Sequence, residues 1–198
     1  MTVLCTLFFA LYDRRIKLKR DNNLYNLIIS TLFVTINIVL ANVALNLKLP
    51  LFLDTLGTML GVRFFGLKYG LLIAGAGAFV NSFTDPYAIP YLPTYIATAI
   101  MISVVYNNKK LKKLPLLLKA LLVTLPSATI GGIITAYIFG GITSSGTSII
   151  LAALTKTGLS LVQSSMIVQI VFEFIDKIAM MFLMETSMKY IPEEIINR

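Results

Sequence analysis

The chain has 198 residues, of which 57% are hydrophobic and 13% are charged, and its mean hydropathy is +0.84. Soluble domains contain roughly 45–50% apolar and about 25% charged residues, so this composition favours one integral membrane domain. The single cysteine excludes an internal disulfide and a thiolate metal cage, and the absence of histidine removes the usual catalytic base and metal ligand. We therefore expect no metal, no cofactor and no enzyme activity.

Residues 1–23 are predicted to form an interfacial and basic cytoplasmic segment. Residues 1–12 are apolar, but a helix needs about 20 residues to cross a bilayer, so we expect an interfacial segment or the remainder of a longer N-terminus. The charges follow this apolar run, whereas a signal peptide carries them before it. Residues 13–20 are strongly basic and are expected in the cytoplasm.

Residues 24–190 are predicted to form an all-α membrane domain, a bundle of six transmembrane helices with a short second helix. The expected helices cover residues 24–47, 54–65, 68–83, 94–106, 115–139 and 159–184. Pro126, followed by Gly131 and Gly132, predicts a kink in the fifth helix. We expect loops at residues 84–93 and 140–148, and a cytoplasmic tail at 191–198.

The basic residues set the expected topology. The net charge is +8, but the lysines and arginines gather at the ends of apolar segments, which argues against nucleic-acid binding. With residues 14–20 and 109–113 inside, both termini lie in the cytoplasm and the protein is a multi-pass protein of the cell membrane. The polar and aromatic residues near 42–54 and 81–95 then face outward.

An outward-facing pocket is expected around residues 49–61. Here Asp54 lies between two strongly apolar segments and needs either a ligand or a structural role such as capping the next helix. Aromatic walls with amide or carboxylate anchors are the usual composition of a small-molecule site. The candidate ligand-binding residues are Asn42, Asp54, Thr55, Asn81, Asp85, Tyr87, Tyr91, Tyr95, Gln163 and Gln169. The alternatives are an interfacial belt for the tyrosines and interhelical hydrogen bonds for the asparagines. An acid in such a pocket favours a neutral or cationic ligand over an anionic one.

A row of small residues marks one face of the third predicted helix. Gly70, Ala74 and Ala78 are spaced four residues apart, which lets another helix approach closely. This face suits either packing inside the bundle or the docking of a partner subunit.

Three ionisable residues interrupt the last apolar segment. Glu173 and Lys177 are four residues apart with the acid first, the favourable order for a helical ion pair, and Asp176 lies beside them. Charges within a span usually pair or face the bundle interior. The alternatives are a structural ion pair, a proton or ion pathway, and a contact with a coupling partner.

These motifs resemble the substrate-binding (S) components of energy-coupling factor (ECF) vitamin transporters, in a clostridial-type branch of that family. The resemblance covers residues 24–192 and rests on the six short hydrophobic segments and the Pro-rich loop at 85–93. Its sequence motifs are LPLFLDTLG at 49–57, FGLKYG at 65–70 before a helix ending in Asn81, FGGITSSGT at 139–147 and FIDKI at 174–178.

The resemblance implies a binding subunit for a vitamin-like micronutrient, with its site near the outer face. It implies as partners a coupling transmembrane subunit and two cytoplasmic ATPases, which together deliver the ligand inward. The sequence contains no Walker A motif, so the chain itself is not expected to hydrolyse ATP. Family members usually carry an Ala-xxx-Ala pattern in the first helix for docking, and here Ala74 and Ala78 offer that pattern instead.

Two other functions stay open at this point. The main alternative is a membrane-embedded sensor or signalling module without transport. The least favoured is an intramembrane enzyme that uses the carboxylates of Glu173 and Asp176.

Overall fold

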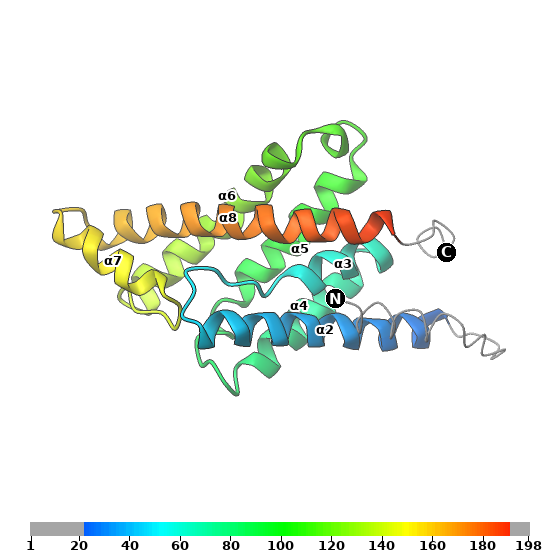
Figure 1. The fold of residues 1–198 in the computed structure, drawn as a ribbon, viewed down its shortest axis with the longest axis horizontal. Helices are drawn as coiled ribbons and strands as arrows, with labels where there is room; N and C mark the ends of the chain where they lie inside the picture. The colour runs from blue at the N-terminus through cyan, green and yellow to red at the C-terminus, as the bar shows by residue number, and fades with distance from the viewer. Residues whose placement is uncertain (1–21, 191–198) are drawn as a thin grey trace.

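The computed structural model describes residues 22–190, and over that range the chain is helical without β-strands (Figure 1). The expected segments at residues 1–21 and 191–198 lie outside the described residues. The helices are α2 (Asn22–Asn46), α3 (Leu56–Phe65), α4 (Leu67–Asn81), α5 (Leu92–Asn107), α6 (Leu116–Ile133), α7 (Thr147–Lys156) and α8 (Leu161–Lys189). A 3₁₀ turn, η1 (Leu111–Lys113), follows α5, and a π-helical segment, η2 (Ile134–Ile138), continues α6.

The all-α class is confirmed for the described residues. The expected helices begin and end within two residues of the observed ones, except that α8 continues to Lys189. Helix α7 was not expected, and the irregular stretch of α6 lies at η2 rather than at Pro126, which sits inside the helix. Among the described helices, Leu24–Asn46 and Leu116–Ile138 are long and apolar enough to cross a membrane. The bundle of six spans therefore stays a prediction.

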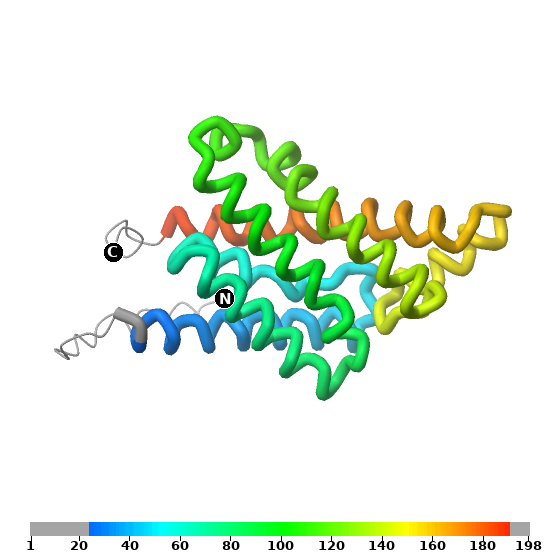
Figure 2. Tube along the Cα trace, turned by 180° about the vertical axis from the view of Figure 1, so that it is seen from behind, coloured from blue at the N-terminus to red at the C-terminus, as the bar shows by residue number. Residues whose placement is uncertain are grey.

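Helix α3 lies at the centre of the bundle and contacts α2, α4, α5 and α8. Helices α2 and α8 run along the long axis on either side of it, and the start of α2 and the end of α8 lie at the same end of the molecule (Figures 1 and 2). Helix α7 lies at the opposite end, beside the start of α8.

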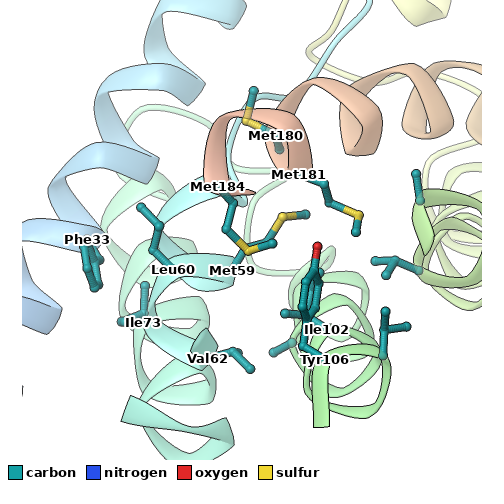
Figure 3. Packing of buried hydrophobic residues seen from close by; sticks show 14 residues of the cluster. Phe33, Met59, Leu60, Val62, Ile73, Ile102, Tyr106, Met180, Met181 and Met184 are labelled. Carbon is teal, nitrogen blue, oxygen red and sulfur yellow. The ribbon is translucent and has the colours of Figure 1, made fainter. Parts of the chain in front are cut away.

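Methionines fill much of the buried core. Met59 of α3 faces Met181 and Met184 of α8, and all three side chains are almost fully buried (Figure 3). Ile73 of α4 and Ile102 of α5 complete the cluster. Unbranched, flexible methionine side chains adapt to the irregular space between helices that meet at different angles.

An asparagine on α2 holds the start of α3. The backbone N–H of Gly57 donates to Oδ1 of Asn37 at 2.6 Å, and Nδ2 of Asn37 donates to the Thr58 hydroxyl at 2.9 Å. The first N–H groups of a helix have no partner within it, so Asn37 supplies one from the neighbouring helix. A Cβ at Gly57 would lie 1.9 Å from the carbonyl oxygen of Phe33, so only glycine permits this approach.

The docking face predicted at Gly70, Ala74 and Ala78 is wrong, because all three residues are buried inside the chain. Ala74 and Ala78 are each 2% exposed, and a Cβ at Gly70 would meet the side chain of Val62 on α3. The small residues bring α4 close to its own neighbour α3, and a partner subunit cannot reach them.

Replacing Gly57 with alanine is expected to lower the free energy of unfolding by about 1–3 kcal/mol, because the new methyl group forces α3 away from α2. The matched control is Gly75→Ala on α4, where a Cβ has no neighbour within 4 Å. That change is expected to stabilise the helix by about 0.5–1 kcal/mol. Thermal unfolding of the detergent-purified variants measures both effects, and equal stability of the two would contradict the tight approach.

Candidate ligand-binding site

A cavity of about 80 Å³ lies among the ends of α2 and α4, the start of α5, the middle of α8 and the loops between them. This is the end of the bundle opposite the start of α2 and the end of α8. Eight of the ten candidate residues line it: Asn42, Asp54, Asn81, Asp85, Tyr87, Tyr91, Tyr95 and Gln169. The space would hold several water molecules, so it fits a small molecule or one group of a larger one.

The two remaining candidates do not line the cavity. Thr55 is buried at the start of α3, and its hydroxyl has no hydrogen-bond partner. Gln163 forms a capping box with Ser160, which accounts for its side chain at the start of α8. Both residues therefore belong to the starts of helices and do not contribute to the cavity wall.

Asp54 does not cap α3, because Thr55 holds the N-cap position and makes no side-chain cap bond. The Asp54 carboxyl instead interacts with the hydroxyl of Tyr95, on α5. The residue before it, Leu53, has a φ of 54° and donates its N–H to Oδ1 of Asp176 at 2.8 Å. A leucine rarely adopts positive φ, so this bond to α8 holds the segment in a conformation that aims Asp54 at the cavity.

Asp54 lies on the segment between α2 and α3, outside the helices. Desolvation within the bundle raises the pKa of its carboxyl to about 6, and the negative charge of Asp176 acts in the same direction. The positive charge of Lys177 and the hydrogen bond from Tyr95 oppose this rise. At pH 7.5 the carboxyl is therefore mainly ionised.

Glu173, Asp176 and Lys177 form a buried ion cluster in the middle of α8. Nζ of Lys177 lies 3.3 Å from Glu173 and 3.4 Å from Asp176, and the three residues are at most 4% exposed. Glu173 and Lys177 also line the cavity, which the sequence did not predict. Their spacing had indicated an ion pair, but nothing in the sequence placed that pair beside Asp54.

A threonine hydroxyl fixes two of the cavity's polar side chains. Thr135, in η2, donates to the carbonyl of Gly131 at 2.8 Å. Its single proton is then used, so its oxygen accepts from the Tyr91 hydroxyl at 2.6 Å and from Nε2 of Gln169 at 2.9 Å. Both side chains are held in one orientation, and the amide oxygen of Gln169 points away from this bond.

Aromatic rings and a second aspartate close the outer part of the cavity. The ring of Phe139 lies 4.6 Å from that of Tyr87 and stacks at 5.7 Å on that of Tyr91. Asp85 accepts from the N–H of Tyr87 at 3.0 Å and from the hydroxyl of Ser144 at 2.7 Å. Asp85 therefore joins loop 84–91 to loop 139–146. The sequence had suggested only turn residues in the second loop, although its run of hydroxyl residues at 143–145 was a visible signal.

One polar atom at the cavity has no partner within the described residues. Asn81 is 6% exposed, lines the cavity at the end of α4, and its Oδ1 has no hydrogen bond. A buried carbonyl oxygen without a donor costs about 1–3 kcal/mol, so it is suited to accept a hydrogen bond from a bound molecule.

Replacing Thr135 with valine is expected to lower the free energy of unfolding by about 1–3 kcal/mol, because the Tyr91 hydroxyl and the Gln169 amide lose their shared acceptor. The matched control is Thr129→Val on the same helix, where the exposed hydroxyl bonds only the carbonyl of Leu125. Denaturant unfolding compares the two variants. Equal, small losses would show that the Thr135 hydroxyl does not organise the cavity.

No model of a protein family matches the sequence, and neither a curated protein nor a solved structure matches it. The case for a function therefore depends on the cavity and the bundle described above.

Proposed function

We propose that this chain is the substrate-binding subunit of an ECF-type transporter. It binds a small, vitamin-like molecule at the outer face of the cell membrane and delivers it inward with a coupling membrane subunit and two ATPases. The observation that carries this proposal is the cavity itself, in which eight polar and aromatic candidates from six separate parts of the chain meet at one end of the bundle.

The distribution of side chains supports a bundle surrounded by lipid. Large apolar residues are exposed on every long helix, such as Leu27 at 51%, Phe79 at 59%, Leu117 at 58% and Phe182 at 58%. Charged and polar groups are instead buried, among them the ion cluster of α8 and Asn37. A soluble protein rarely exposes so much apolar surface. It usually keeps its charged side chains in contact with water.

The cavity's lining supports a flat, polar ligand. Tyr87, Tyr91 and Tyr95 line the cavity, and aromatic rings such as these can pack against a planar ligand. Asn81 at the end of α4 and Gln169 on α8 supply amide groups to the cavity wall. Sites that recognise one small molecule typically combine aromatic walls with a small number of fixed polar groups.

The bundle's core explains why transport would need movement of the whole subunit. Below the cavity, toward the end of α8, the methionine and isoleucine cluster around Met59 and Met181 is fully packed. A ligand bound above that cluster reaches the other side only if the subunit tilts in the membrane. A separate, ATP-driven coupling module would supply that work.

Binding is tested by calorimetry and native mass spectrometry of the detergent-purified protein against a panel of vitamins and related heterocycles. At a concentration of about 100 times Kd, a true ligand is expected to raise the free energy of unfolding by about 2.7 kcal/mol. No binding by any flat heterocycle in the panel would overturn the proposal.

A space-filling variant tests whether the ligand occupies this cavity. Ala41→Phe places a ring into the lining from a half-buried position of α2 and is expected to reduce affinity at least about tenfold. Ala152→Phe on the exposed surface of α7 is the control and is expected to bind as the unchanged protein does. Equal affinities in both variants would place the ligand elsewhere.

Co-purification separates transport from the alternative of a membrane sensor. A transport subunit expressed in its native host is expected to bring down a coupling membrane protein and two ATPases. A sensor would bring down a signalling partner and no ATPase.

A further inference from the structure

We propose that the cavity selects a cationic ligand, with an ammonium group or a protonated nitrogen heterocycle held between Asp54 and Asn81. This inference rests on the proposed binding function and names the chemical class of the ligand. It follows from the balance of charges at the cavity, from an unpartnered acceptor and from the aromatic wall.

The charges at the inner end of the cavity do not cancel. Asp54, Glu173 and Asp176 supply three carboxylates, and Lys177 supplies one ammonium group. Lys177 is 2% exposed and lies within 3.4 Å of both Glu173 and Asp176, so its charge is already shared by two acids. Burying uncompensated negative charge is unfavourable, and a cation bound at Asp54 would relieve it.

Glu173 lines the cavity but is paired with Lys177, and the bonds of the other acids leave Asp54 as the acid that can meet a ligand. Asp176 is fully buried, holds the N–H of Leu53 and does not line the cavity. Asp85 is engaged by the Tyr87 N–H and the Ser144 hydroxyl. Asp54 interacts with the neutral hydroxyl of Tyr95, and its carboxylate retains lone pairs for a further donor.

Asn81 provides a second observation that is independent of charge. Asn81 lines the cavity, and its Oδ1 is buried and lacks a donor, so a ligand that brings an N–H or O–H group to this amide would satisfy it. An ionised carboxylate group of a ligand has only acceptors to offer at this position. An ammonium or a protonated ring nitrogen offers donors to Asn81 and charge to Asp54 at once.

The aromatic wall favours the same chemical class. Tyr87, Tyr91 and Tyr95 all line the cavity, and the face of a tyrosine ring attracts a cation within about 6 Å of its centre. Tyrosine rings beside the Asp54 carboxylate would add to the stabilisation of a bound positive charge.

Three probes of similar size and different charge test the inference: benzylammonium, benzyl alcohol and benzoate. Their affinities for the detergent-purified protein are measured at pH 7.5 by ligand-observed NMR and by thermal shift. Benzylammonium is expected to bind at least about tenfold more tightly than benzyl alcohol, and benzoate is expected to bind most weakly.

Two variants show whether Asp54 is the source of the preference. Asp54→Asn is expected to weaken benzylammonium about tenfold and to leave benzyl alcohol nearly unchanged. Glu185→Gln removes the same charge at the far end of the bundle, where Glu185 pairs with Lys119, and is expected to keep the order of the probes.

The outcomes separate this inference from the binding function. Equal binding of benzyl alcohol, or tighter binding of benzoate, would overturn the cationic preference and leave the binding site in place. A preference that persists in Asp54→Asn would also overturn it. If no probe and no member of the vitamin panel binds, the binding function fails together with this inference.

Discussion

The bond between Asp176 and the backbone N–H of Leu53 is the contact on which the rest of the site depends. It joins residues 123 positions apart and ties the middle of α8 to the segment that leads into α3. Leu53 has positive φ, a conformation that costs a non-glycine residue about 1–2 kcal/mol, and the bond to a buried carboxylate offsets that cost. Because Asp54 follows directly, the same bond fixes where its carboxylate points, and Lys177 then holds Asp176 in place.

The bundle uses buried polar groups to position its helices. Asn37 supplies the first turn of α3 with an acceptor from α2, and Thr135 joins α5 and α8 through Tyr91 and Gln169. In an apolar surrounding, such groups find no water to replace a missing partner, so each bond specifies one arrangement of two helices. Six buried polar side-chain atoms of the described residues have no partner, and among these residues Asn81 is the one that lines the cavity, where a bound molecule could supply the missing donor.

Much of this arrangement was predictable from the sequence, but the links between distant parts were not. Long apolar segments located the six expected helices, with the end of α8 missed by five residues, and the polar residues of the loops and helix ends located eight residues of the cavity. The apolar run of the short helix α7 is six residues long, too short to indicate a membrane span, and nothing marked the π-helical turn at η2. Small residues at a spacing of four predict a close helix contact, but they do not reveal whether the partner helix lies in the same chain. This was the case for Gly70, Ala74 and Ala78.

The two ends of the bundle differ in charge, which bears on how a ligand would pass. At the end opposite the cavity, Glu185 accepts from Tyr106 and pairs with Lys119, and the Arg63 guanidinium lies 4.6 Å from the centre of the Tyr106 ring. This end is basic and the cavity end is acidic, with the packed methionine core between them. A cation that left the cavity through the bundle would meet first the apolar core and then positive charge. Exchange through the cavity end avoids both barriers, so the inward delivery that we propose is more consistent with reorientation of the whole bundle than with a channel along its axis.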